Sequence, residues 1–257
     1  MAEPAVDAGD AWVELAVGHH RGQVVATFFR AAYLRVGGEV VAVGSTDVPA
    51  GPLHLRLLNL PGARPGAPVS IADGMMGIGT SLIDLARTPR WAPPAVDDAG
   101  VAAAARRAAL LVGGGRSWFA ARSDLDDAIE EIATGRLDHL ARRISGLGPG
   151  LTPAGDDVLA GVMLVHALAG RPARERQAAI DVARTRTGPI PLAFLRWAAR
   201  GRSIEPVHRL LVALTSADVA TVAASQRRVL AIGASSGADL VLGLRVGLQA
   251  VERSLRT

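Results

Sequence analysis

From residue 12 to about residue 71, short apolar runs are separated by glycine and proline, a pattern typical of strands and turns. The pair Gly37-Gly38 separates two of these runs and favours a tight hairpin turn. Apolar and polar residues alternate around His54 and Arg56, so these two side chains share one face of a predicted strand. The predicted strands are Gln23–Phe29, Tyr33–Val36, Glu39–Val43, Leu53–Leu58 and Ala67–Ile71.

The end of this β-rich part is marked by a change in composition. The dipeptide Pro93-Pro94 makes a natural linker. Shortly before it, residues 77–81 spell Gly-Ile-Gly-Thr-Ser, which would suit an anion at a helix start. A lone Gly-x-Gly is a weak signal, however, and a plain turn explains it better. We therefore expect residues 1–95 to form a β-rich barrel or sandwich and residues 96–257 to form a second domain.

Beyond the linker the apolar positions recur with the period of helices. Ser123 precedes acidic residues and an apolar run, so it is expected to be a helix N-cap. The sequence thus predicts an α+β protein, an N-terminal β-rich domain followed by a C-terminal helical bundle. The expected helices span residues 101–111, 123–132, 137–144, 158–169, 174–184, 191–199, 204–214, 217–231 and 238–255.

A loop of glycines and prolines, residues 146–157, opens the most apolar of these helices. Glycines such as Gly148 and Gly150 let backbone N–H groups approach a ligand, and Thr152 adds a hydroxyl. The start of a helix also carries unpaired donors and a partial positive charge. This combination indicates a binding site for an anion.

Two adjacent carboxylates, Asp156 and Asp157, stand at the start of the same helix. They complement the helix dipole, so a capping role explains them. They are also suited to hold a metal ion or to accept a hydrogen bond from a substrate N–H. The loop therefore indicates where a site lies and says less about its chemistry.

The pattern Gly-x-Asp-x-x-x-Gly of this helix start returns at residues 237–243, again before an apolar helix and again after hydroxyl-bearing residues. The Asp and the second Gly are four residues apart, so they lie on one face of a helix. Two such helices can pack through their glycines, and their preceding loops then converge. The equivalent pairs are Gly155 and Gly237, Asp157 and Asp239, and Gly161 and Gly243.

We call these two loop–helix junctions, residues 146–161 and 233–243, the two corners. Each corner alone is explained by dipole compensation and by the packing of small residues. The two together favour a shared ligand site, a polar pocket between two helix starts. The candidate catalytic residues are Asp156, Asp157 and Asp239, of which Asp157 and Asp239 are the candidates for a metal ion. The candidate substrate- or phosphate-binding residues are Gly148, Gly150, Thr152, Gly155, Ser235, Ser236 and Gly237.

Composition narrows the classes of function. The chain is 49% hydrophobic, 20% charged and only 4% aromatic, typical of a globular protein with a core of small side chains. Its net charge is +4, and all 28 basic residues are arginines, which bind carboxylate or phosphate through paired hydrogen bonds. The arginines are spread along the chain without interleaved aromatic residues, and genome composition explains their number. Nucleic-acid binding is therefore not expected.

Two absences bear on the compartment. The chain has no cysteine, which removes disulfides and thiol chemistry and is compatible with a reducing cytoplasm. The first ten residues lack the basic start and apolar stretch of a signal peptide. The longest apolar run, Val158–Ala169, is too short to span a bilayer. We expect a cytoplasmic protein with no membrane partner.

Histidines are weaker candidates. His19 and His20 are adjacent, so on a strand they point to opposite faces, and we expect an exposed pair. His139, His166 and His208 lie on separate predicted helices. His166 lies inside the apolar helix and is expected to be a hydrogen-bonded core residue rather than a ligand.

At its two corners the sequence resembles the AllH-like family, bacterial proteins long classed as a domain of unknown function. The named member is a subunit associated with oxamate carbamoyltransferase. The matching segments are residues 146–161 and 233–243, and more loosely residues 83–85 with Trp91 and Pro93. The family is expected to carry a serine after a threonine-rich turn, whereas residues 185–191 contain none. The contribution of that turn is therefore an open question here.

This resemblance implies a role in carbamoyl transfer. In the reaction assigned to the family, oxalurate and phosphate exchange with oxamate and carbamoyl phosphate, in the allantoin branch of purine breakdown. The resemblance implies a small anionic substrate, further protein subunits as partners and, at Asp157 and Asp239, a place for Mg²⁺ if the reaction uses it. Carbamoyl transfer requires donors for the phosphate and the carbamoyl oxygen, and an acceptor for an amide N–H.

Two alternatives stay open at this stage. The chain is a non-catalytic structural or regulatory subunit that binds a small anion, or it acts on another acyl or carbamoyl substrate, since a shared fold does not fix the reaction.

Overall fold

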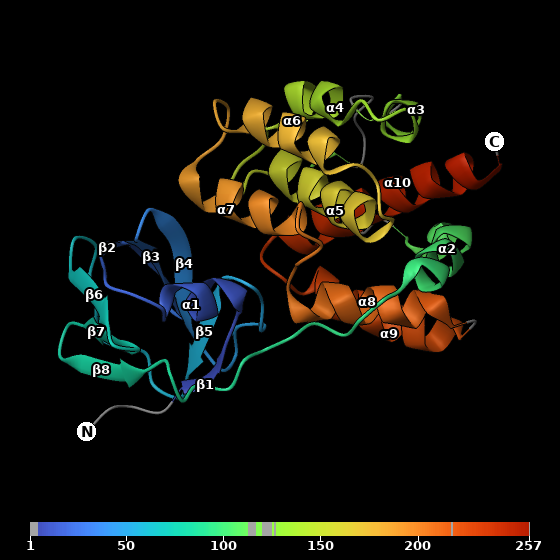
Figure 1. Cartoon of the computed structure of the whole chain (residues 1–257). Helices are drawn as coiled ribbons and strands as arrows, with labels where there is room; N and C mark the ends of the chain where they lie inside the picture. Colours follow the sequence, from blue (N-terminus) through green and yellow to red (C-terminus); the bar gives the residue numbers. More distant parts are fainter. Residues whose placement is uncertain (1–4, 113–116, 120–124, 126, 217, 257) are drawn as a thin grey trace. The chain divides into compact units, whose positions relative to one another are not determined.

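The computed structural model describes residues 5–112, 117–119, 125, 127–216 and 218–256. It divides into two compact units, residues 1–93 and 94–257, each described here by itself. About 47% of the chain is helical and 18% is strand, with the strands in the first unit and all but one helix in the second. The predicted α+β class is confirmed (Figure 1).

The first unit is one eight-stranded sheet that curls into a nearly closed barrel. Its strand order is β1-β5-β4-β3-β2-β6-β7-β8. The pairing of β4 with β5 is parallel, and the other neighbours in this order are antiparallel. The strands are β1 (Ala5–Ala8), β2 (His20–Thr27), β3 (Ala31–Val36), β4 (Glu39–Ser45), β5 (His54–Leu57), β6 (Pro68–Ala72), β7 (Met75–Ile78) and β8 (Ser81–Asp84).

The predicted hairpin at Gly37-Gly38 is present and joins β3 to β4. Both glycines have positive φ, 59° and 87°, which a two-residue hairpin turn requires. Trp12 is fully buried in the core of this unit. Its indole N–H donates to the carbonyls of Ala42 (3.1 Å) and Leu53 (2.9 Å), so a polar atom of the core has partners.

Some expectations for this unit are wrong. A short helix, α1 (Asp10–Leu15), occupies residues where strands were expected to begin, and β1 before it was not predicted. The Gly-x-Gly-Thr-Ser segment, by contrast, precedes no helix and contains the plain turn favoured for it. Gly79, with φ of 58°, lies in the turn between β7 and β8. Short apolar runs do not distinguish helix from strand, which accounts for the missed α1 and β1.

The second unit is a bundle of helices whose bounds lie close to those predicted. The described helices are α2 (Asp98–Arg106), the 3₁₀ turn η1 (Ala108–Leu110), α3 (Ala128–Ala133), α4 (Leu137–Ile144), α5 (Ala154–Leu168), α6 (Ala173–Ala183), α7 (Pro189–Ala198), α8 (Glu205–Thr215), α9 (Val219–Leu230) and α10 (Ser236–Arg256). The expected N-cap Ser123 lies outside the described residues.

Helix α5 forms the centre of this bundle. Every residue from Ala154 to His166 is buried, and α10 packs beside this helix (Figure 1).

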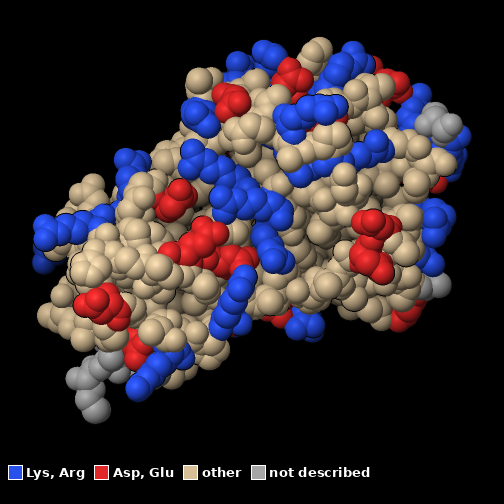
Figure 2. Space-filling view, viewed as in Figure 1, with Lys and Arg blue, Asp and Glu red and all other residues tan. Residues whose placement is uncertain are grey.

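On the face drawn in Figure 2, arginines are spread over the surface with acidic side chains among them. Among the described helices, none is both long enough and apolar enough to cross a membrane.

Candidate functional site

Helices α5 and α10 cross at the two glycines of the repeated pattern. A Cβ atom added at Gly161 would lie 2.7 Å from the carbonyl oxygen of Leu240, and one added at Gly243 would lie 2.1 Å from that of Val158. Only residues without a side chain allow backbones to approach this closely. The prediction that the two helices pack through these glycines is confirmed.

The two helices run in the same direction at this crossing. Gly243 lies against Val158, and one turn further along α10, Gly247 lies against Val162, one turn further along α5. The contacts therefore advance in the same direction along both helices. Both helix N-termini, with their partial positive charges, consequently lie at the same end of the crossing.

The chain enters both helices in the same way. The N–H of Gly155 donates to the carbonyl of Leu147 (2.9 Å), and the N–H of Gly237 donates to that of Ile232 (3.0 Å). The next two amides of α5 both donate to Pro153 O, and the next two of α10 both donate to Ser235 O. These helix-start N–H groups already have partners, so the donors left for a ligand are those of the loops and hydroxyls.

The two corners meet through hydroxyl groups. Thr152 Oγ1, before α5, lies 3.1 Å from Ser236 Oγ, the first residue of α10. Thr152 also donates to Asp157 Oδ2 at 3.1 Å. Thr152 and Ser236 are partly exposed, whereas Asp157 is only 8% exposed. The predicted convergence of the two loops is therefore present, with a carboxyl group below two hydroxyls.

Asp157 has a raised pKa. Burial raises its pKa to about 8, while hydrogen bonds from Ser236 and Thr152 oppose that rise. The nearby carboxyls of Asp239 and Asp156 raise the pKa further, because like charges disfavour ionisation. The Asp157 carboxyl therefore holds its proton more tightly than an exposed carboxyl does.

Asp239 occupies the equivalent position on α10 and has different partners. It is fully buried, and its Oδ1 accepts from the Ser117 hydroxyl (2.7 Å) and the Trp118 N–H (3.1 Å). Its Oδ2 has no hydrogen-bond partner among the described residues. Burial raises the pKa of Asp239, and hydrogen bonds from Ser117, Ser235 and the backbone oppose this.

Ser117 is a site residue that sequence reasoning missed. It lies between a run of glycines and two aromatic residues, with no periodic pattern around it. Its partner Asp239 is 122 residues away, so only the fold brings them together. A serine without a local signal of this kind cannot be selected from a single sequence.

Asp156 joins two loops to each other. Its Oδ1 accepts from the Gly146 N–H at 3.1 Å, and its Oδ2 accepts from the Thr187 hydroxyl. Burial raises the pKa of this carboxyl, and the two hydrogen bonds lower it. A Cβ at Gly146 would lie 2.1 Å from Arg186 O, so the glycine loop rests on the turn at residues 185–191. The turn at residues 185–191 therefore contributes the Thr187 hydroxyl that holds Asp156.

The glycine loop has the shape that only glycine permits. Gly148 and Gly150 have φ of 103° and 106°, in the left-handed region. Gly148 lies against Ala154, while residues 149–151 are exposed. The loop is therefore tied down at both ends and open to solvent at its tip.

With this geometry described, a comparison with known families can be made. Residues 144–248 match the family described as oxamate carbamoyltransferase subunit AllH. This part of the chain is similar to that family. The match begins at the last residue of α4 and ends within α10, so it contains both corners and the crossing between them. No solved structure matches the chain.

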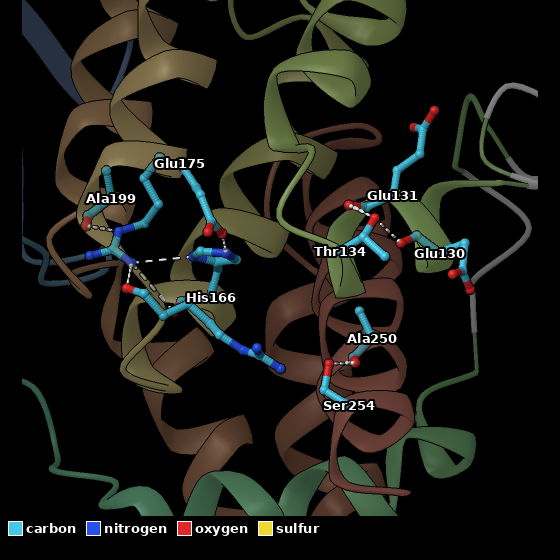
Figure 3. Close-up of polar contacts among 10 residues, drawn as sticks. Glu130, Glu131, Thr134, His166, Glu175, Ala199, Ala250 and Ser254 are labelled. Atoms are coloured by element: carbon cyan, nitrogen blue, oxygen red, sulfur yellow. Dashed lines mark hydrogen bonds and ion pairs between the residues drawn. The ribbon is translucent and has the colours of Figure 1, made fainter. Parts of the chain in front are cut away.

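The matched region also contains His166, which is buried and hydrogen-bonded in the core, as predicted. Arg176 donates to its Nδ1 (3.2 Å), so its Nε2–H donates to Glu175 (2.9 Å), toward which the ring points in Figure 3. Burial lowers the pKa of His166 to about 4. The adjacent cavity, lined in part by Arg171 and Gly247, has room for about one water.

Proposed function

We propose that this chain is a subunit of a carbamoyltransferase that acts on oxamate or oxalurate with carbamoyl phosphate or phosphate, in the allantoin branch of purine catabolism. The observation that carries the proposal is the meeting of the two corners, with Thr152 and Ser236 in contact above the Asp157 carboxyl. The name of the matching family supports the choice of reaction.

In this proposal the phosphate end of the substrate lies on the glycine loop. The open loop tip and the left-handed glycines leave the amides of Gly148 and Gly150 near the surface, and the hydroxyls of Thr152 and Ser236 stand beside them. Such donors also stabilise the oxygen that gains negative charge when the carbamoyl carbon becomes tetrahedral. Ser235 and Gly237 complete the second corner.

The carbamoyl end lies toward Asp157 and Asp239. Amide N attacks the carbamoyl carbon, the C–N bond forms, the C–O bond to phosphate breaks, and the amide N–H proton must leave. A buried carboxylate is an acceptor for that proton. Asp156 has both oxygens engaged with Gly146 and Thr187, so we propose that it holds the loops in place and does not touch substrate.

Magnesium is an optional part of the proposal. The described residues hold no group of three His, Asp or Glu side chains suited to a metal ion. A Mg²⁺ ion here would depend largely on substrate phosphate oxygens and water, a common arrangement for this ion. We assign no step to it, and the assay below includes it as a variable.

Partner subunits follow from the family name, which describes a subunit. We propose that the chain works with other proteins.

The second candidate function is a non-catalytic subunit that binds a small anion. The complete burial of Asp239 favours it, because a carboxyl group out of reach of solvent suits a structural role.

The test is carbamoyl phosphate consumption with oxamate, measured with the purified chain alone and with companion subunits, each with and without Mg²⁺. We expect turnover in the mixture and a loss of about 100-fold or more in Asp157→Asn, which cannot pass on a proton. The matched control is Asp138→Asn, a partly exposed carboxylate paired with Arg142 on α4.

Turnover in the mixture that survives Asp157→Asn would make the chain an anion-binding scaffold. Absence of turnover in every mixture would overturn the proposed reaction.

A further inference from the structure

The hairpin between β2 and β3 exposes large aromatic side chains. Phe29 is 94% exposed and Phe28 is 50% exposed. The ring of Phe28 packs edge-on against Tyr33, with the ring centroids 6.1 Å apart. The chain has four phenylalanines and one tyrosine, so this hairpin carries half of the first and all of the second. Exposed aromatic side chains gathered in this way are typical of a contact with another molecule.

The turn itself does not explain these residues. Its two central residues are Phe29 and Arg30, and the N–H of Phe28 closes it by donating to the Ala31 carbonyl (2.7 Å). Two-residue hairpin turns favour glycine, asparagine or aspartate, which adopt positive φ at little cost. Among the described residues other than glycine, only Asp73 has a positive φ, so this turn does not use that conformation. A phenylalanine here contributes little to the turn and leaves its ring in water.

A further exposed apolar side chain lies at the same end of the sheet. The carbonyl of Arg30 accepts from the N–H of Ser45 (2.9 Å), and Ser45 pairs with Leu57 at the end of β5. Because neighbouring strands lie about 4.8 Å apart, the backbones of Arg30 and Leu57 are separated by about 10 Å. Leu58, the next residue, is 65% exposed. Together with the two phenylalanines it forms an apolar surface, which we call the aromatic tip.

The surroundings of the aromatic tip carry more positive than negative charge. Residues 15–38 contain three arginines and no acidic residue, and residues 58–72 contain Arg64 and no acidic residue. Arg30 and Arg64 are exposed and have no ion-pair partner among the described residues. Asp47, in the loop after β4, is an exposed carboxylate near this end. The complement of such a surface is an apolar pocket rimmed by carboxylates.

We infer that the aromatic tip is the docking surface for a companion protein subunit, whose matching surface is an apolar pocket rimmed by acidic side chains. Phe29 fills the pocket, and Arg30 pairs with a carboxylate at its edge. The inference rests on the partner subunits of the proposed function and goes beyond them, because it assigns their contact to the barrel. The family match covers residues 144–248 and includes none of this surface.

A protein partner fits this surface better than two other occupants. The matching family is described as a subunit, which favours a protein over a lipid surface. A second copy docked tip to tip would bring the arginines of both copies together, and like charges across an interface are unfavourable.

The test measures binding of the full chain to separately purified companion subunits, the proteins whose genes adjoin the gene of this chain, by biolayer interferometry. We expect at least one of them to bind. Phe29→Ser and Leu58→Ser should each weaken its affinity about 10- to 100-fold, as expected of buried anchor residues. Val17→Ser is the matched control, because Val17 is 77% exposed in the same unit but outside the aromatic tip. Hydrogen exchange in β2 and β3 verifies that each variant is folded.

A charge reversal tests the acidic rim of the pocket. Arg30→Glu should weaken binding about 10-fold or more, and the loss should be smaller at high salt because exposed charges are screened. Arg21→Glu is the control, since Arg21 is an exposed arginine near the start of β2. Equal affinities of the two variants would contradict the acidic rim.

Failure of every companion subunit to bind, or binding that is unchanged in Phe29→Ser, would overturn the inference. A dimer of the chain, or its binding to vesicles of phosphatidylcholine and phosphatidylserine, would also overturn it if Phe29→Ser abolished that association. Docking through the aromatic tip without carbamoyl phosphate turnover in any mixture would support the inference and overturn the proposed reaction. Turnover with docking unchanged in Phe29→Ser would do the reverse.

Discussion

Gly161 and Gly243 are related by a local twofold arrangement. Each lies against the backbone of the residue three positions before the other, Leu240 for Gly161 and Val158 for Gly243. The glycines at the two helix starts are also equivalent, since each lies against the helix that precedes its own. A Cβ at Gly155 would meet Ile144 O at 1.8 Å, and one at Gly237 would meet Val229 O at 2.0 Å. The two corners are thus two copies of one structural device.

Adding a single methyl group at the crossing should destabilise the helical unit. In Gly243→Ala the new Cβ has to move the backbone at Val158, for which we expect a cost of about 3 kcal/mol. Hydrogen exchange in α5 and α10 measures it for this unit alone. Gly188→Ala is the control, because its Cβ would meet only ordinary contacts at 3.8 Å or more. Equal protection in both variants would contradict close packing at the crossing.

The protonation of Asp157 predicts a pH dependence of stability. Its pKa is about 8 in the folded chain and near 3.8 without burial, so between these values the folded state binds more protons than the unfolded state. Stability therefore falls as pH rises from about 4 to about 8, by at most about 1.4 kcal/mol per pH unit from this group. In Asp157→Asn this contribution should vanish, as a pH series of hydrogen-exchange protection would reveal.

Removing the hydroxyl of Thr187 should release the glycine loop. Thr187→Ala leaves Asp156 Oδ2 buried with no donor, at an expected cost of about 1–3 kcal/mol. Limited proteolysis at residues 149–151 should become faster, and Thr187→Ser should behave like the wild type. Thr185→Ala is the control, since that exposed hydroxyl only donates to Val182 O. Unchanged cleavage would show that the loop does not depend on this bond.

The contacts of Arg176 predict that this residue stabilises the folded helical unit at a place remote from the two corners. Its guanidinium donates to Ala199 O (2.8 Å), Arg171 O (2.6 Å) and His166, joining the ends of three segments (Figure 3). Arg176→Ala should cost about 2–4 kcal/mol, since three acceptors lose one donor group. The exposed neighbour Arg174→Ala should cost little. Thermal melting of the two variants would check this, and equal melting temperatures would contradict it.

Much of the helical unit follows from the sequence alone. Helix α4 has the predicted bounds of 137–144, because its apolar positions are strictly periodic and the glycine loop ends it. The crossing was predictable because two copies of Gly-x-Asp-x-x-x-Gly place an Asp and a Gly on one helix face. Such patterns depend only on local geometry, which a sequence records directly.

Other features depend on contacts that the sequence does not record. Helix α1 has only six residues, too few to show a helical period, and the tertiary packing of Trp12 decides its conformation. The partners of the aspartates are also hidden. Asp156 appears equivalent to Asp157 in the sequence, and only the approach of Thr187 from 31 residues away separates their environments.

The bond between Ser117 and Asp239 sets a minimum length for a working fragment. The AllH match starts at Ile144, whereas Ser117 and Trp118 precede it. A chain cut at the boundaries of the match would keep both corners and yet leave the Asp239 carboxylate without the two donors that hold its Oδ1. The matched region and the smallest fragment expected to keep the Asp239 carboxylate oriented are therefore different, and the second must reach back at least as far as Ser117.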